Sequence, residues 1–323
     1  MAQSDQPLQP GAYRYTLTAD CSGLRLDQAL PACNLQISRR LARRFIEIGG
    51  VHLDGRRMRQ CGYTVGAGQR LELFVDGFDL EPFVLDECHL LFRDAHLLVV
   101  NKPAGIAVQP TPARYRGTLY DALQRLLTSE RGGRWQPSIG MMQRLDRDTS
   151  GVMVFSIHPA AHGNLTRAFR ERQVEKRYLA LVGGNVEAGE GRFCSLLARR
   201  RANNLTVSVD HGGRYAETHY RVRQRLPEAT LVEVSPLTGR THQIRAHFAE
   251  AGHPLLGDTA YGGLRELKGQ KFARQMLHAA ELVIPHPVSG GRLTFQAPTA
   301  DDMLAALQQM EHVYEEPASK GQG

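Results

Sequence analysis

The segment QRLDRDTSG, residues 143–151, combines two carboxylates with two guanidinium groups in a stretch that is prone to form a turn. Asp146 lies between Arg144 and Arg147, and a second acid follows at Asp148. Adjacent cations favour the ionised form of a carboxylate, which suits a nucleophile and does not suit a general acid. By itself the segment is equally compatible with a solvated surface loop, so its meaning depends on the rest of the chain.

The same segment partly matches the D-x-D-x-[TV] nucleophile loop of haloacid-dehalogenase phosphatases. That loop has four apolar residues before its first Asp and Thr or Val at its fifth place. Here Gln143 and Arg144 precede Asp146, and the fifth residue is Ser150. The sequence also lacks recognisable magnesium ligands for such an enzyme, so we expect no metal site. The phosphatase stays an alternative that a magnesium requirement would distinguish.

A second polar segment, GRTHQIRAHFAEAGHPLLGDTAYGG, residues 239–263, concentrates basic side chains where a helix is expected to begin. Arg245 in this segment is able to pair with an acid, which would orient the guanidinium group and hold it charged. His242 and His247 are five residues apart, so they do not share a helix face as a zinc-binding pair at i and i+4 would. We therefore expect these histidines to form hydrogen bonds rather than bind a metal.

A third segment, EKRYLALVGG, residues 175–184, places an aromatic residue at the start of an expected strand. Tyr178 follows the cations Lys176 and Arg177 and precedes a run of apolar residues. An aromatic residue in this place most often packs in the core. Here its face is also suited to stack on a base while its hydroxyl stays polar.

The composition of the whole chain indicates what these segments serve. The 323 residues are 42% hydrophobic, which predicts two domains with a sizeable core. The 40 Lys and Arg exceed the 33 Asp and Glu, and the net charge of +7 favours an anionic partner. The planar guanidinium group of arginine suits phosphates, so arginine-rich runs predict a nucleic acid; they lie at 38–44, 54–59, 167–177 and 198–204.

The same composition bears on location. No apolar run approaches the roughly 20 residues that span a bilayer, and the polar N-terminus has no apolar core of a signal peptide. The five cysteines are scattered and form no CxxC pair, which argues against a disulfide framework or a zinc ribbon. We therefore expect a cytoplasmic protein without membrane association.

Apolar periodicity predicts a small α/β domain over residues 14–75. Helical spacing appears at 24–33 and again at 37–49, and the second helix stops at a Gly-Gly pair. The following residues predict a β-hairpin that turns at Asp54-Gly55. An acidic stretch without a long periodic element, 76–89, is expected to be a linker.

A larger domain is expected over residues 90–313, where strands outnumber helices and do not alternate with them regularly. This pattern predicts an α+β fold with a mixed, largely antiparallel sheet rather than a doubly wound fold. Residues 1–13 and 314–323 lack periodic apolar residues and are expected to be disordered tails.

In order and spacing, the chain resembles the RluA-type pseudouridine synthases. The resemblance is carried by QRLDRDTSGVMVFS, VEKRYLALVGG and LTGRTHQIRAHFAEAGHPLLGDTAYGG, with LLVVNKPAGIAVQP before them and MLHAAELVIPHPVSGGRLTFQAP after them. It covers about 90–300. Residues 22–74 resemble an S4-type RNA-binding domain through RLDQAL, SRRLARRFIEIGGVHLDG and VGAGQRLEL. The resemblance implies a catalytic domain of the pseudouridine synthase type behind a small S4-like domain.

The resemblance also implies roles for individual residues. Asp146 occupies the place of the family's essential aspartate, Arg245 that of the arginine paired with it, and Tyr178 that of the tyrosine packed against the target uracil. The family usually has His where this chain has Gln143, a departure that bears on substrate preference more than on activity. Together with the basic runs, the motifs indicate RNA contacts at Arg39, Arg40, Arg43, Arg44, Gln143, Arg144, Arg147, Arg240 and His242.

Pseudouridine formation breaks the N-glycosidic bond of uridine, turns the uracil and rejoins it through carbon. Because these reaction steps need no redox step and no outside electron sink, we expect an isomerase without a cofactor or a metal. We also expect the protein to be a monomer. Large-subunit ribosomal RNA is the expected substrate, with transfer RNA as an alternative. A non-catalytic RNA-binding protein is a further alternative, but it would lack Asp146, Tyr178 or Arg245. Whether Asp146 attacks C1′ or abstracts a sugar proton is open at this point.

Overall fold

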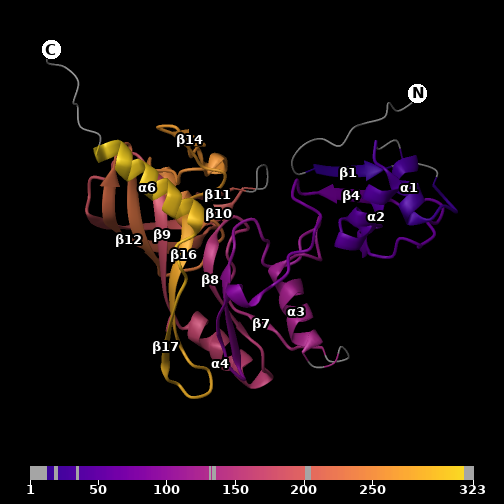
Figure 1. The fold of residues 1–323 in the computed structure, drawn as a ribbon, viewed down its shortest axis with the longest axis horizontal. Coiled ribbons are helices and arrows are strands. Elements are labelled where there is room, and N and C mark those ends of the chain that lie inside the picture. The colour runs from indigo at the N-terminus through magenta and orange to yellow at the C-terminus, as the bar shows by residue number, and fades with distance from the viewer. Residues whose placement is uncertain are drawn as a thin grey trace, which may run out of the picture. The chain divides into compact units, whose positions relative to one another are not determined.

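The computed structural model describes residues 13–17, 21–33, 36–130, 132, 136–200 and 205–315, the side chains of 312–315 excepted. The chain forms two compact units, Met1–Leu85 with Gly105–Gln136 and Asp86–Ala104 with Pro137–Gly323 (Figure 1). The domain limits expected from the sequence stay predictions, and the structure groups Gly105–Gln136 with the N-terminal residues. The predicted tails lie outside the described residues, apart from 13, 314 and 315.

The first unit contains a four-stranded antiparallel sheet in the order β1-β4-β2-β3. Its elements are β1 (Tyr13–Leu17), α1 (Leu26–Ala32), α2 (Arg39–Ile48), β2 (Val51–Leu53), β3 (Arg56–Met58), β4 (Leu71–Val75) and α3 (Leu119–Ser129).

Local signals in the sequence account for the elements of this unit. The Ser38 hydroxyl caps α2 by accepting from Leu41 N, and Gly49 ends the helix in the left-handed conformation. The β2–β3 hairpin turns at Asp54 and Gly55 with φ of 49° and 77°, as an Asp-Gly turn requires. The expected hairpin and the second helix are therefore present.

The segment Gly105–Gln136 belongs to the first unit through specific contacts. The carbonyl of Ile48, at the end of α2, accepts hydrogen bonds from Tyr115 N at 2.7 Å and Arg116 N at 3.0 Å. Arg114 is buried and forms an ion pair with Asp76, with a 2.9 Å Nε–Oδ2 distance. A buried arginine retains its charge favourably only beside such a partner, so this segment is an integral part of the unit.

The second unit is built on an eleven-stranded sheet whose main path runs β11-β10-β12-β13-β9-β16-β8-β6-β5. Its strands are β5 (Leu90–Arg93), β6 (Leu97–Lys102), β7 (Gly140–Met141), β8 (Ser150–Ser156), β9 (Glu175–Gly183), β10 (Glu190–Arg199), β11 (Thr206–Ser208), β12 (Arg214–Leu226), β13 (Ala229–Pro236), β16 (Leu277–Pro285) and β17 (Arg292–Gln296). Its other elements are η1 (Glu87–His89), α4 (Pro159–Arg170), α5 (Gln243–Glu250), η2 (Thr259–Tyr261), β14 (Glu266–Leu267), β15 (Gln270–Lys271) and α6 (Asp301–Glu315).

The sheet is mixed but largely antiparallel. Only β16 and β8 pair in parallel, and the other pairs that the structure describes run antiparallel. The α+β architecture expected from the irregular alternation of strands and helices is confirmed. No helix within the described residues is both long and apolar enough to cross a membrane.

Helices cover both faces of the sheet at its centre, as the alternation of side chains along β9 shows. Ala180 and Val182 pack in one core with Phe248 of α5. Leu181, which points to the other face, packs with Met303 of α6. The continuous apolar runs of β6 and β8 are buried, and α4 packs over them.

Close approach at Gly151 aligns the start of β8 with two other strands. Gly151 lies opposite Ala279 of β16, which in turn lies opposite Tyr178 of β9. A Cβ atom at Gly151 would be 2.2 Å from the Ala279 carbonyl oxygen, and its φ is +116°. Only glycine fits this position, and the loop that carries Asp146 leads into β8 at a point separated from Tyr178 of β9 by Ala279 of β16.

Candidate active site

Three side chains from distant parts of the second unit form a continuous ionic cluster. Arg245, in the first turn of α5, donates from Nη1 to Asp146 Oδ2 at 2.9 Å. It also donates from Nε and Nη2 to the two carboxylate oxygens of Asp258, at 2.6 and 2.7 Å. The structure therefore brings together Asp146 and Arg245, which are 99 residues apart in the sequence.

Burial divides this cluster into an inner and an outer part. The side chain of Asp258 is 1% exposed and that of Arg245 is 9% exposed, whereas that of Asp146 is 26% exposed. Burial opposes the charge of Arg245, but hydrogen bonds and charge from Asp258 and then Asp146 outweigh it and raise the pKa of Arg245. The cluster thus holds a permanent cation behind one accessible carboxylate.

The start of α5 is fixed by a side chain whose hydrogen bonds are all made within the protein. The Gln243 carbonyl oxygen accepts from the Thr238 hydroxyl at 2.7 Å and from Arg240 N at 3.0 Å. Its amide nitrogen donates to Glu217 O and to the Thr218 hydroxyl, both at 2.9 Å. These bonds tie the turn before α5 to β12, and so place Arg245 at the end of the sheet.

Two buried basic side chains hold the backbone of the loop that carries Asp146. Lys102, at the end of β6, donates from Nζ to the Arg147 carbonyl at 2.8 Å. Arg274 donates to the Asp148 carbonyl at 2.9 Å and forms a two-point ion pair with Asp302 of α6, at 2.7 Å for both contacts. The two carbonyls that follow Asp146 are therefore each fixed, and burial lowers the pKa of Lys102 to about 7.

Tyr178 lies on β9, partly exposed, and packs against the core between β9, β13 and α5. Loss of hydration and then the nearby negative charge of Asp146 raise the pKa of Tyr178. Its hydroxyl therefore stays protonated at neutral pH, and its ring offers an apolar surface near the carboxylate.

His242 is the residue before α5 and has a left-handed backbone, with φ of 53°. Its Nδ1 is 3.0 Å from the Tyr261 hydroxyl, and its Nε2 is 3.8 Å from Asp146 Oδ2. His247, in contrast, is buried and contacts the hydroxyls of Thr218 and Ser195 at 2.9 and 3.1 Å. The two histidines thus face different surroundings.

The other residues expected to contact RNA in this unit differ in their environment. Arg144 is exposed and Arg147 partly so. Arg240 donates from Nε to the Tyr215 carbonyl at 2.9 Å. The amide nitrogen of Gln143 is buried and has no hydrogen-bond partner among the described residues.

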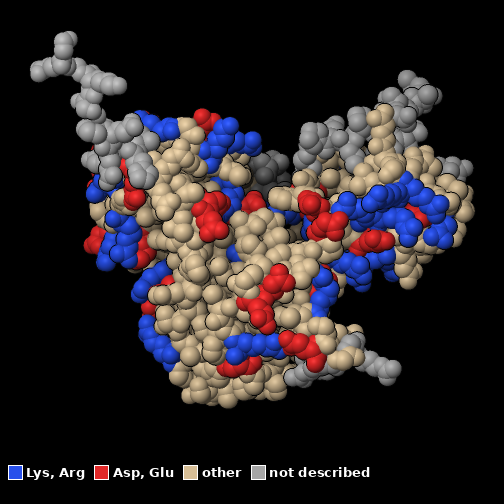
Figure 2. Space-filling view, viewed as in Figure 1, with Lys and Arg blue, Asp and Glu red and all other residues tan. Residues whose placement is uncertain are grey.

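A basic surface covers α2 in the first unit, where Figure 2 shows Lys and Arg side chains gathered. Arg39 pairs with the fully buried Asp27 at 3.0 Å, and Arg44 pairs with Glu81 at 2.6 Å. Arg40 and Arg43 are exposed, and neither forms an ion pair with a described residue.

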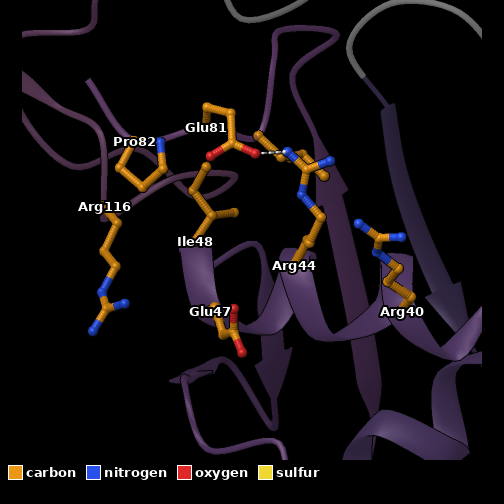
Figure 3. Close-up of a pocket in the computed structure, with 8 residues that line it drawn as sticks. Arg40, Arg44, Glu47, Ile48, Glu81, Pro82 and Arg116 are labelled. Atoms are coloured by element: carbon orange, nitrogen blue, oxygen red, sulfur yellow. Dashed lines mark hydrogen bonds and ion pairs between the residues drawn. The ribbon is translucent and has the colours of Figure 1, made fainter. Parts of the chain in front are cut away.

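A groove runs beside this basic surface (Figure 3). Figure 3 shows Arg44 reaching Glu81 across one of its sides. The segment that follows Gly105 contributes Arg116 to it. The lining residues are Arg40, Arg44, Glu47, Ile48, Leu80, Glu81, Pro82 and Arg116.

Two groups of side chains within the described residues have the composition of a metal site, Asp86 with Cys88 and His89, and Asp94 with His96 and His286. Hydrogen bonds account for the second group. Asp94 Oδ1 accepts from His96 N and Leu97 N, both at 2.7 Å, and Oδ2 lies 2.9 Å from His286 Nε2. This is the pattern of an aspartate that stabilises a turn.

Sequence reasoning missed several residues that build the site. Asp258, Lys102, Gln243, Arg274 and Tyr261 were not assigned to the site, although Asp258, Gln243 and Tyr261 belong to the polar segment 239–263. For Asp258 a signal is present, since an acid in the run LLGDTAYGG, between apolar residues and glycines, needs a buried partner. For Lys102 and Arg274 nothing local indicates which carbonyls they hold.

Comparison with known proteins identifies the family to which this sequence is similar. Residues 96–250 match the family described as RNA pseudouridylate synthase, and residues 24–71 match the S4 domain. Ribosomal large subunit pseudouridine synthase D of Zymomonas mobilis is 36% identical over 304 residues, covering 89% of this chain and 94% of that protein. The protein of the same description from Nitrosomonas europaea is 35% identical, covering 92% of this chain and 88% of that protein.

Solved structures show the same fold. The structure titled Human RNA Pseudouridylate Synthase Domain Containing 4 aligns with a TM-score of 0.58 at 24% identity, over 69% of this chain and 92% of that one. Human RNA Pseudouridylate Synthase Domain Containing 1 aligns with a TM-score of 0.56 at 25% identity, over 75% of this chain and 100% of that one.

Proposed function

The chain belongs to the RNA pseudouridylate synthase family and is an RNA pseudouridine synthase with an N-terminal S4 domain, and we propose that it modifies uridines of large-subunit ribosomal RNA. The observation that carries this target is the similarity of nearly the whole chain, both units included, to proteins described as acting on the large ribosomal subunit. Transfer RNA is the alternative substrate. We retain from the sequence the proposals of a cytoplasmic location and a monomeric state.

In the proposed mechanism Asp146 is the group that acts on the ribose of the target uridine. It is the accessible carboxylate of the ionic cluster, and Arg245 orients it through the 2.9 Å contact. Because the pKa of Arg245 is raised, its guanidinium group stays protonated and places a fixed positive charge beside the carboxylate. An anion held in one orientation is suited either to attack C1′ or to take a sugar proton.

Tyr178 serves as the platform for the uracil in this mechanism. The target base must leave its stack to reach Asp146, which costs a few kcal/mol. Stacking on an aromatic ring contributes about 1–3 kcal/mol per base, which offsets much of that cost. The raised pKa of Tyr178 keeps its hydroxyl a hydrogen-bond donor rather than an anion beside Asp146.

The remaining basic residues hold the RNA backbone in this proposal. Arg40 and Arg43 on α2 are free to neutralise phosphates. Arg39 and Arg44 already form ion pairs with carboxylates. Their guanidinium groups would therefore be shared between these carboxylates and the RNA phosphates. Arg144, Arg147, Arg240 and Gln143 are assigned to the strand that carries the target uridine.

The experiment that tests the target is base-resolution mapping of pseudouridine in ribosomal and transfer RNA from cells with and without the gene. The proposal predicts that specific sites in large-subunit ribosomal RNA are lost and return with the wild-type gene. The Asp146→Asn gene, expressed to the same level, should not restore them. Loss of pseudouridine from transfer RNA alone would show that transfer RNA, and not ribosomal RNA, is the substrate. Restoration of the sites by Asp146→Asn would contradict the assignment of Asp146.

A further inference from the structure

Two side chains of the active-site cluster are open to a substrate. The side chains of Asp146 and His242 are 26% and 22% exposed, whereas Arg245 and Asp258 lie behind them. The His242 Nε2 atom lies 3.8 Å from Asp146 Oδ2. The substrate therefore meets a carboxylate oxygen and an imidazole nitrogen side by side.

The hydrogen bonds of Tyr261 determine which nitrogen of His242 carries the proton. The Tyr261 hydroxyl accepts from Thr206 N at 2.8 Å and donates to the Thr206 carbonyl at 3.1 Å. With that proton assigned to the Thr206 carbonyl, Nδ1 is the donor in the 3.0 Å contact between His242 Nδ1 and the Tyr261 hydroxyl. In the neutral ring the Nε2 atom then carries a lone pair, assigned here from the network of hydrogen bonds.

The surroundings of His242 favour this neutral ring. Burial lowers the pKa of His242, and the nearby cations Arg245 and Arg199 act in the same direction. The anions Asp146 and Asp258 oppose them without reversing the shift. At neutral pH the ring therefore presents an acceptor at Nε2, next to a second acceptor on Asp146.

We propose that His242 Nε2 accepts a hydrogen bond from the 2′-hydroxyl of the target ribose and so makes the enzyme select RNA. This inference rests on the proposed role of Asp146. Whether that carboxylate attacks C1′ or removes a proton at the sugar, C2′ and its hydroxyl lie beside it. Two adjacent acceptors are suited to a donor from the substrate, and the 2′-hydroxyl is the donor of the ribose nearest to C1′. It is also the group that distinguishes RNA from DNA.

The backbone of His242 provides a matched variant. Asparagine tolerates the left-handed conformation that His242 adopts, with φ of 53°. Its amide nitrogen occupies nearly the place of Nδ1 and is able to donate to Tyr261, but the side chain is too short to place an atom at Nε2. Glutamine, in contrast, is long enough to place its amide oxygen near the Nε2 position.

The test is a cycle that combines enzyme variants with substrate variants. Single-turnover rates would be measured for a short synthetic RNA that carries either uridine or 2′-deoxyuridine at the mapped position, with the wild-type full chain and with His242→Asn. Since both enzymes meet the same pair of substrates, the intrinsic effect of the missing hydroxyl on reactivity cancels. For wild type the ratio of the two rates should exceed that for His242→Asn by about tenfold, the worth of one hydrogen bond.

Further variants distinguish a contact from a structural effect. His242→Gln should retain part of the wild-type ratio, and Tyr261→Phe, which removes the acceptor for Nδ1, should lower it. The inference would be overturned if a folded His242→Asn had the same ratio of uridine to 2′-deoxyuridine rates as wild type, which includes the case in which the variant slows both RNAs equally. Asp146→Asn is assayed in parallel. If it is inactive while the ratios are equal, only the role of His242 fails, whereas activity in Asp146→Asn removes the proposed function itself.

Discussion

Arg245 and Asp258 form a two-point ion pair in which both oxygens of a carboxylate that is 1% exposed are engaged, at 2.6 and 2.7 Å. This pair uses the Nε and Nη2 atoms of the guanidinium group and leaves Nη1 to Asp146. Asp258 therefore fixes the direction in which Arg245 points. The orientation of the accessible carboxylate of Asp146 therefore depends on the buried carboxylate of Asp258, 112 residues further along the chain.

This relationship predicts the effect of Asp258→Asn. The variant leaves a buried arginine with one anion instead of two, so the free energy of unfolding should fall by about 3 kcal/mol. The single-turnover rate at saturating RNA should fall between about tenfold and a hundredfold because Asp146, the proposed reacting carboxylate, is misplaced. The dissociation constant for RNA should hardly change. Glu266→Gln, an exposed acid on β14, is the control, and a normal rate for folded Asp258→Asn would show that Arg245 does not need Asp258.

The buried Lys102 predicts a dependence of stability on pH. Its pKa is about 7 in the folded chain, against 10.5 for an ordinary lysine. Between these values the unfolded chain binds a proton that the folded chain does not, so Lys102 favours folding more strongly as the pH rises from about 7 to 10. The difference in unfolding free energy between wild type and Lys102→Met should increase with pH by up to about 1.4 kcal/mol per unit.

Chemical denaturation at pH 7, 8 and 9 checks this expectation. Comparison with Lys102→Met cancels the titration of the other groups. A difference that is constant over this range would mean that Lys102 keeps its proton in the folded protein. A difference that decreases as the pH rises would show that folding raises the pKa of Lys102 instead of lowering it.

The exposed arginines of α2 predict a change in the salt dependence of RNA binding. Each phosphate contact contributes about 0.7–0.9 to the slope of log K against log salt concentration. Arg40→Gln with Arg43→Gln should reduce this slope by about 1.5 and leave the single-turnover rate at saturating RNA unchanged. For a charge-matched comparison, Arg43→Gln alone is set against Arg292→Gln, an exposed arginine on β17 that pairs with Glu175. An unchanged slope in the double variant would show that α2 does not contact RNA.

Local sequence signals predicted much of the fold. The second helix, α2, ends at Gly49 in the expected Gly-Gly pair, and the Asp54-Gly55 pair makes the expected hairpin turn. These features depend on residues that are neighbours in the chain. The largely antiparallel character of the sheet also followed, because helices are too few to connect parallel strands.

The site was only partly predictable because most of its contacts join residues that are far apart in the chain. Asp146 and Arg245 stood out because of their types and their surrounding motifs. The contacts of the Asp146 loop with Arg245, Lys102 and Arg274 depend on strand order, including the parallel pairing of β8 with β16. No local periodicity encodes which strands become neighbours. The role of Arg274 becomes visible only in the structure, where Arg274 donates to the Asp148 carbonyl at 2.9 Å.

The single-turnover rate of pseudouridine formation by Asp146→Asn measures whether Asp146 is the reacting carboxylate. Asparagine keeps an oxygen that accepts from Arg245 and removes the negative charge, so folding and RNA affinity should be preserved. We predict that product formation falls to the background of an enzyme-free reaction, while the melting temperature and the dissociation constant for RNA stay close to those of wild type. A folded, RNA-binding Asp146→Asn that turns over within tenfold of the wild-type rate would show that Asp146 is not the reacting carboxylate.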